Sequence, residues 1–202
     1  MITSLADIKA LLSITTTSQD DLINRNIPII EDDIRVYCNN GFSNDRVYIQ
    51  TGDVSFTRNS TSADVITYDG LGEGFIDANF KAGYTVQIQG SYNNDGFFDI
   101  ETVSSTVMTL YSSTSRPYFD NLVTEDESVS IKINQVDYPR ALDNTVAKMV
   151  QGKLAVSTVD DNVISETVSR YRVEFAGADM TANGYPKKTM DALNKWKLVV
   201  FT

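Results

Sequence analysis

The sequence predicts an α+β protein in which a small helical domain is interrupted by an antiparallel β-barrel or β-sandwich domain. Apolar residues recur with the helical period in residues 1–45 and again in residues 136–202. Between them, residues 46–135 contain short runs of Thr, Ser, Val, Ile, Tyr and Phe divided by Gly, Asn and Asp, which is typical of strands and turns. We therefore expect a discontinuous helical domain (1–45 with 136–202) and an inserted all-β domain (46–135). The helical domain should hold about four helices and a short strand or hairpin.

Two apolar stripes separated by three threonines predict the first two helices. The first should begin near Thr3 or Ser4, and the second should be capped by Ser18. Pro28 falls inside the second helix, where we expect a kink or a local break. Residues 39–41 (Asn-Asn-Gly) should end that helix as a C-cap. The stripes are Leu5, Ile8, Leu11 and Leu12, then Ile23, Ile27, Ile30, Ile34, Tyr37 and Cys38.

The middle region predicts six strands. Alternate residues of a strand point to opposite faces, so the alternation in residues 84–89 predicts one buried and one solvated face. Asn94, Asp95 and Gly96 should form a tight hairpin turn, because the Asp-Gly pair accepts the positive φ that such a turn requires. The expected strands are Val47–Gln50, Asp64–Tyr68, Tyr84–Gln89, Phe97–Val103, Thr106–Tyr111 and Ser128–Ile133.

The last third of the chain returns to the helical pattern. A helix should open at Tyr138 and Pro139, because proline is tolerated in the first turn. Val156–Ser165 is polar and should be a loop, and Thr167–Phe175 alternates like a strand or hairpin arm. A turn at 183–186 should lead into a final helix. The apolar stripes are Leu142, Val146, Met149, Val150 and Leu154, then Thr189, Leu193, Trp196 and Val200.

Composition excludes several function classes. The chain has 202 residues, no histidine, a single cysteine (Cys38) and a formal net charge of −10. A catalytic group that needs imidazole, a His-ligated metal, a Cys-rich zinc site and a disulfide framework are therefore excluded, and we expect Cys38 to be buried. The acidity disfavours nonspecific nucleic-acid binding. The N-terminus shows no secretory pattern and no stretch approaches the ~18 apolar residues of a membrane span, so we expect a cytosol-like setting.

Other motifs do not fit their functions. Gly70–Gly74 lacks the GK[ST] ending of a phosphate loop, and a calcium loop beginning at Ser91 would place Glu101 one residue from the ligand position. The carboxylate pairs Asp20-Asp21, Asp32-Asp33 and Asp160-Asp161 favour a solvated surface over an enzyme using paired carboxylates, such as a glycosidase. We expect no catalytic site, metal or cofactor.

Charge is spread unevenly along the chain. Residues 1–45 carry a net −4, residues 46–135 carry −7 and residues 136–202 carry +1. The final helix holds Lys187, Lys188, Lys195 and Lys197 against Asp191, together with the only Trp, and is followed by an apolar run. Tryptophan surrounded by basic residues is typical of an interface anchor, so this segment either packs on its own domain or docks on a partner.

The order of these segments resembles the head–tail connector (adaptor) proteins in the neck of long-tailed bacteriophages. The residues that carry the resemblance are Ile2–Leu12, Ile34–Phe42, Tyr138-Pro139, Ile164–Val173, and Gly184–Pro186 followed by Leu193 and Trp196. Compact connectors join the second and third helices directly. Here Phe80–Ser91 and Asn94–Ile100 resemble a module that is inserted in some connectors and occurs in other phage structural proteins.

The resemblance implies a non-enzymatic structural protein of the virion neck, assembled in the host bacterial cytoplasm, that binds no membrane. It implies a homo-oligomeric ring of roughly twelve copies, closed by head-to-tail contacts, beneath the portal protein. The other face would receive a stopper or tail-completion protein, and DNA would pass through the lumen without sequence-specific binding. The portal-facing candidates are Tyr185, Pro186, Lys187, Lys188, Trp196 and Phe201.

An alternative is another phage tail or baseplate protein whose β module binds a host surface glycan. The aromatic residues of the β region would then line a groove, whereas alternation places most of them in a core or in cross-strand pairs. These residues are Tyr84, Tyr92, Phe97, Phe98, Tyr111, Tyr118 and Phe119.

Overall fold

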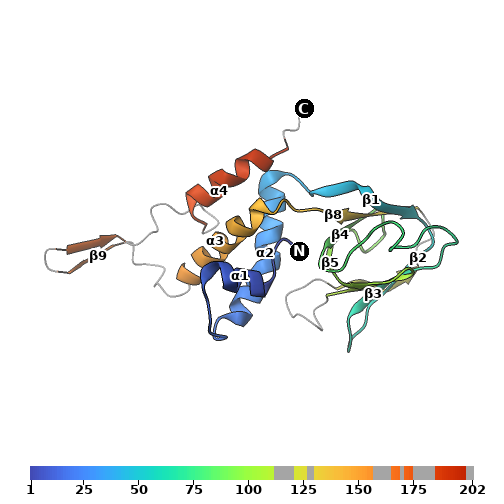
Figure 1. The fold of residues 1–202 in the computed structure, drawn as a ribbon, viewed down its shortest axis with the longest axis horizontal. Helices are drawn as coiled ribbons and strands as arrows, with labels where there is room; N and C mark the ends of the chain where they lie inside the picture. Colours follow the sequence, from blue (N-terminus) through green and yellow to red (C-terminus); the bar gives the residue numbers. More distant parts are fainter. Residues whose placement is uncertain (112–120, 127–129, 157–164, 169–170, 175–184, 199–202) are drawn as a thin grey trace. The chain divides into compact units, whose positions relative to one another are not determined.

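The computed structural model describes residues 1–111, 121–126, 130–156, 165–168, 171–174 and 185–198. The chain divides into two compact units (Figure 1). The β unit comprises Gly41–Tyr138 with Met1, and the helical unit comprises Ile2–Asn40 with Pro139–Thr202. The expected α+β class is confirmed, because the four α-helices lie in one unit and an eight-stranded antiparallel sheet lies in the other.

In the helical unit, four α-helices pack around the apolar stripe of the second. Helices α1 and α2 both contact α3, and α4 contacts α2 and α3. The predicted stripe of α2 is confirmed, since Ile23, Ile27, Ile30, Ile34 and Cys38 are buried. The helices are α1 (Leu5–Leu12), α2 (Asp20–Cys38), α3 (Ala141–Val156) and α4 (Lys187–Leu193), which is followed by the short 3₁₀ helix η2 (Asn194–Trp196).

The helix ends match the sequence patterns only in part. Ser4 caps α1 in a capping box: its hydroxyl accepts from the Asp7 amide (3.2 Å), and the Asp7 carboxylate accepts from the Ser4 amide (3.3 Å). The predicted cap at Ser18 is wrong, because α2 is preceded by Gln19, which makes no side-chain cap bond. The expected break at Pro28 is also absent. The helix continues because the buried Ile27 and Ile30 on either side hold it against the rest of the unit.

The β unit consists of one antiparallel sheet that bends at β5. The first half of β5 pairs with β4 and the second half with β6, with a register shift between Ile100 and Thr102. The sheet order is β1-β8-β4-β5-β6-β3-β2-β7. The strands are β1 (Ser43–Thr51), β2 (Val54–Thr57), β3 (Asp64–Tyr68), β4 (Thr85–Gln89), β5 (Gly96–Val103), β6 (Val107–Leu110), β7 (Glu125–Asp126) and β8 (Ile131–Val136).

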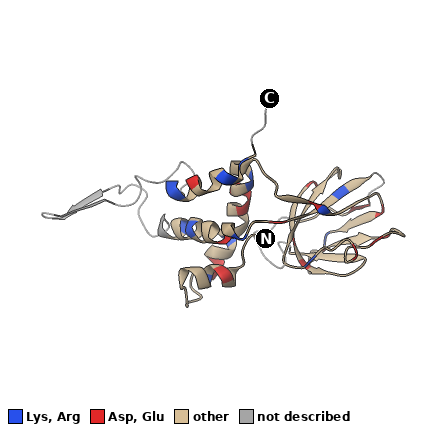
Figure 2. Ribbon diagram, turned by 45° about the horizontal axis from the view of Figure 1, so that its top comes forward, with Lys and Arg blue, Asp and Glu red and all other residues tan. Residues whose placement is uncertain are grey.

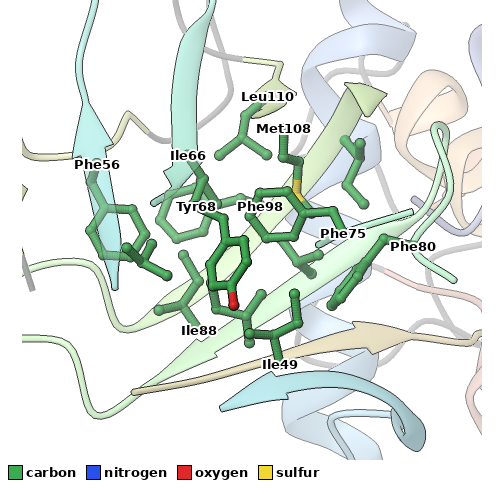
Figure 3. Packing of buried hydrophobic residues seen from close by; sticks show 14 of the residues in the cluster. Ile49, Phe56, Ile66, Tyr68, Phe75, Phe80, Ile88, Phe98, Met108 and Leu110 are labelled. Carbon is green, nitrogen blue, oxygen red and sulfur yellow. The ribbon is translucent and has the colours of Figure 1, made fainter. Parts of the chain in front are cut away.

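The expected closure into a barrel is wrong. In the described residues β1 and β7 stand at opposite ends of the strand order and do not pair with each other. β7 has only two residues, too few to continue a ladder. Both halves of the bent sheet nevertheless share one apolar core (Figure 3). Its members include Ile49 and Ile88 from one half, Phe56, Ile66 and Met108 from the other, and Phe75 and Phe80 from the segment that joins β3 to β4.

Several local predictions in the β region need correction. β2 and β7 were not expected, and β8 lies three residues further along the chain than its predicted start. The predicted tight turn at Asn94–Gly96 is wrong, because residues 90–95 connect β4 to β5 and Gly96 is already the first residue of β5. The positive φ occurs instead at Gly90 (+86°). Of the candidate groove aromatics, Tyr92 is exposed and Phe98 is buried, while Tyr118 and Phe119 lie outside the described residues.

A two-stranded antiparallel hairpin follows α3 in the sequence. It pairs β9 (Ser165–Val168) with β10 (Tyr171–Glu174), so the predicted strand at Thr167–Phe175 is divided between two strands. Most of the predicted loop Val156–Ser165 lies outside the described residues, as does Phe175. The hairpin forms a sheet of its own. None of the helices described is long and apolar enough to span a membrane.

Candidate interface at the C-terminal helix

Helix α4 is anchored to the helical unit by Tyr185, the residue that precedes its N-cap Pro186. The Tyr185 side chain is fully buried, and its hydroxyl donates to the Asp33 carboxylate of α2. The Lys153 ammonium of α3 lies 4.5 Å from the centre of the Tyr185 ring. Burial, together with the hydrogen bond to Asp33 and its negative charge, raises the pKa of Tyr185 far above its ordinary value, so the hydroxyl stays protonated.

The amphipathic pattern of α4 determines which side chains remain free. Thr189, Met190 and Leu193 are buried against the unit. The remaining positions of α4 and η2 face solvent, and their positive charges are visible in Figure 2. We call the four exposed lysines Lys187, Lys188, Lys195 and Lys197 the basic face.

Main-chain and side-chain bonds hold η2 to the C-terminal end of α2. The Tyr37 hydroxyl donates to Asn194 Oδ1 (2.9 Å), and the Asn40 side-chain amide donates to the Trp196 carbonyl (3.1 Å). The Leu198 amide donates to the Cys38 carbonyl (2.9 Å). These bonds satisfy carbonyls and amides that helix ends otherwise leave unpaired, so the position of η2 is fixed.

Two of the four lysines of the basic face lie over aromatic rings. The Lys197 ammonium is 3.7 Å from the centre of the Tyr37 ring, and the Lys195 ammonium is 5.0 Å from that of Trp196. Both distances are within the range of a cation–π interaction. The arrangement orients these charges while leaving them accessible to a partner.

Trp196 and Cys38 lie beneath this surface. The Trp196 ring is half-buried, and its indole N–H is buried without an acceptor among the described residues. Cys38 is fully buried, as expected, and desolvation raises the pKa of its thiol despite the opposing charge of Lys197. Cys38 is therefore an unreactive packing residue, whereas Trp196 carries an unsatisfied donor of the kind that functional sites tolerate.

The structure separates the predicted interface residues into three groups. Lys187, Lys188 and Trp196 lie together on α4 and η2, where a partner can reach them. Pro186 begins α4, and the buried Tyr185 stabilises the unit rather than presenting a surface. Phe201 lies outside the described residues.

The interface prediction omitted Lys195 and Lys197. The excess of lysine in the closing segment indicated them, but the expected helix through Val200 obscured their positions. α4 ends at Leu193, and Lys197 has an extended backbone (φ −66°, ψ 129°).

Comparison with known protein families gives a match at the N-terminal end of the chain. Residues 2–66 match the model of the phage gp6-like head-tail connector protein family. This region belongs to the phage head–tail connectors. The match spans α1, α2, β1 and β2 and ends inside β3, and it confirms the resemblance inferred from the sequence. No curated protein sequence matches the chain.

Membership of this connector family supports a structural role in the phage neck. No cluster of three or more His, Cys, Asp or Glu side chains suited to a metal ion occurs in the described parts of the chain. The chemistry that the interface offers is therefore that of recognition: exposed positive charge, an aromatic anchor and a fixed main chain.

Proposed function

We propose that this protein is a ring-forming adaptor of the phage neck that joins the portal protein to the next component on the tail side. The connector match over residues 2–66 is the observation that carries the proposal. The uneven charge adds support, because a net −10 chain that gathers exposed lysines on one helix has a defined face for an acidic partner. Portal docking through the basic face follows from this placement.

The remaining acidic surface suits the passage of DNA. A channel wall that carries negative charge repels phosphates, so the duplex would pass without binding to lysine or arginine side chains. In the proposed ring, acidic side chains of the chain line the lumen. A ring structure with a lumen lined by lysine and arginine would contradict this part of the proposal.

The portal contact is tested by reversing two charges. Lys187→Glu with Lys188→Glu should weaken binding to the purified portal protein about tenfold, which corresponds to ~1.4 kcal/mol. The effect should be larger at low salt, because exposed charges are screened. Binding is measured by sedimentation and by surface immobilisation of the portal, and the mass of the adaptor alone is measured in parallel.

The control makes the same change in net charge elsewhere. Lys81→Glu with Lys148→Glu alters two exposed lysines on the β unit and on α3. Equal loss of portal binding in the two variants would show that net charge, not the basic face, is responsible. A strictly monomeric protein that does not bind the portal would refute the proposed function as a whole.

A further inference from the structure

A groove in the β unit runs along the open edge of β1. The groove has a volume of about 540 Å³ and is lined on one side by the consecutive residues Tyr48–Thr51. Successive residues of a strand point to opposite faces of the sheet, and here Tyr48 is 45% exposed while Ile49 is 8% exposed. A cavity that touches all four in succession must therefore lie at the side of the strand, where its main chain is accessible.

The main chain on this side of β1 is unpaired in the described residues. β1 stands at the end of the strand order and pairs only with β8. The regular part of that pairing is Tyr48–Thr51, because the register shifts between Ser43 and Tyr48. An edge strand with free N–H and C=O groups is a template for one more strand.

The opposite wall of the groove is anchored and acidic. Glu73, Asp77, Ala78 and Asn79 line it. Phe75 and Phe80 hold this segment in the core, and the Phe80 amide donates to the Phe75 carbonyl (3.0 Å). Neither Glu73 nor Asp77 makes a side-chain hydrogen bond or ion pair in the described structure, so both carboxylates are available to a cationic ligand.

The hairpin of the helical unit has the complementary deficiency. β9 and β10 form a sheet of only two strands, and an isolated two-stranded hairpin is marginally stable in water. β10 has four residues, as does the regular stretch of β1. β10 also contains Arg172, a suitable partner for Glu73 and Asp77.

We propose that the β9–β10 hairpin of one copy adds to β1 of a neighbouring copy, with β10 occupying the groove between β1 and residues 73–79. This inference rests on the proposed ring, for which it names the contact between subunits. Main-chain hydrogen bonds supply the affinity, and the pairing of Arg172 with the acidic wall sets the register. The donor and acceptor surfaces differ, so the contact is head-to-tail and repeats around a closed ring.

Cross-linking between two different single variants tests the contact in the full-length protein. Gln50→Cys places a thiol on β1, and Val173→Cys places one on β10. Mixing the two oligomeric variants under exchange conditions and adding a short bismaleimide should give a covalent dimer. Wild-type protein should give none, because Cys38 is buried. The matched control combines Val173→Cys with Asp126→Cys, which lies in β7 at the other end of the sheet, and it should give at least tenfold less dimer.

A charge exchange provides a second readout. Arg172→Glu should lower the yield of the cross-linked dimer severalfold, and Glu73→Lys with Asp77→Lys in the acceptor copy should restore it. A yield that does not respond to these charges would overturn the assigned register.

The outcomes separate this inference from the proposed function. A ring that forms without the Gln50–Val173 cross-link overturns strand addition and leaves the adaptor function intact. A cross-link within a single chain, seen when both cysteines are placed in one dilute monomer, overturns the second copy as occupant. A chain that stays monomeric alone and with the portal overturns both.

Discussion

Glu125 shows how single side chains fasten the loops of the β unit. Its carboxylate accepts hydrogen bonds from the Ser91 hydroxyl (2.5 Å), the Asn93 side-chain amide (2.6 Å) and the Asn94 side-chain amide (2.7 Å). Desolvation alone would raise the pKa of Glu125, but these hydrogen bonds outweigh it and lower the pKa to about 2. The ionised carboxylate thereby joins the loop after β4 to β7.

This cluster predicts a dependence of stability on pH. The pKa of Glu125 is about 2 in the folded protein and ~4.3 in an unfolded chain. The stabilisation is therefore fully present above pH ~5 and is lost as the pH falls toward 2. Glu125→Gln should lower the urea midpoint at pH 7 and flatten its decline between pH 5 and 2.

Asp126→Asn is the control for Glu125→Gln, because this exposed neighbour makes no side-chain hydrogen bond in the described structure. Identical urea midpoints for Glu125→Gln and wild type throughout this pH range would contradict the proposed role of the carboxylate.

Single positions also show what the sequence could not reveal. The stripe of α2 was predictable because each isoleucine contributes the same periodic signal. The positive φ of Phe42 (+53°) was not, since bulky residues rarely adopt it. Here the Phe42 ring lies 5.3 Å from that of Tyr138, and the Phe42 carbonyl accepts from the Asp137 amide (2.9 Å). Contacts between distant residues fix this backbone, so no local pattern indicates it.

At the scale of elements, the end of α2 connects helix stability to the candidate interface. Asn39 adopts the left-handed conformation (φ 46°, ψ 43°), and its amide donates to the Val36 carbonyl (3.1 Å). The neighbouring Cys38 carbonyl and Asn40 side chain hold Leu198 and Trp196. The C-cap predicted at residues 39–41 is confirmed, and its geometry orients the groups that bind η2.

Substitution of Asn39 tests this cap. Glycine adopts the left-handed conformation without a steric penalty, so Asn39→Gly should be neutral or raise the free energy of unfolding by up to ~0.5 kcal/mol. Asn39→Ala should lower it by about 1 kcal/mol. Urea unfolding measures both. Ser13→Gly, at the corresponding position of α1 (φ 57°), should behave like Asn39→Gly. An alanine variant more stable than the glycine variant would refute the argument.

Element boundaries were predicted less well than element types. The final helix was expected to continue through Val200, but it changes to a 3₁₀ turn after Leu193 because η2 bonds to the end of α2. β7 escaped detection because two residues carry no periodic signal. Within the candidate interface, the lysines were visible in the sequence, whereas the anchoring of Tyr185 by Asp33 depends on tertiary packing.

For the whole molecule, the ends of the β unit provide a test of its independence. Ser43 of β1 pairs with Val136 of β8, so the chain enters and leaves the unit at neighbouring points. Such an arrangement permits insertion into a loop of another domain without separating its parts. We propose that the β unit is an autonomous domain, with boundaries close to the sequence-based 46 and 135.

Residues 41–138 expressed alone should unfold cooperatively. The buried cluster of the unit draws on both halves of its sheet and is contained within these residues. Circular dichroism melting and the dispersion of amide NMR signals measure the outcome. The companion variant, in which a short Gly-Ser linker replaces 42–137, should retain helical signal and portal binding. A non-cooperative melt of 41–138 would contradict autonomy.

The placement of the β unit also affects the order in which a nascent chain can fold. Helix α2 packs on α3, yet the 98 residues from Gly41 to Tyr138 lie between them in the sequence. At ordinary rates of translation, synthesis of that stretch takes roughly 5–20 s. During this interval the isoleucine stripe of α2 lacks its partner on α3, while the β unit already has all of its strands. We therefore expect the insert to fold first on the ribosome and the helical unit that surrounds it in sequence to fold last.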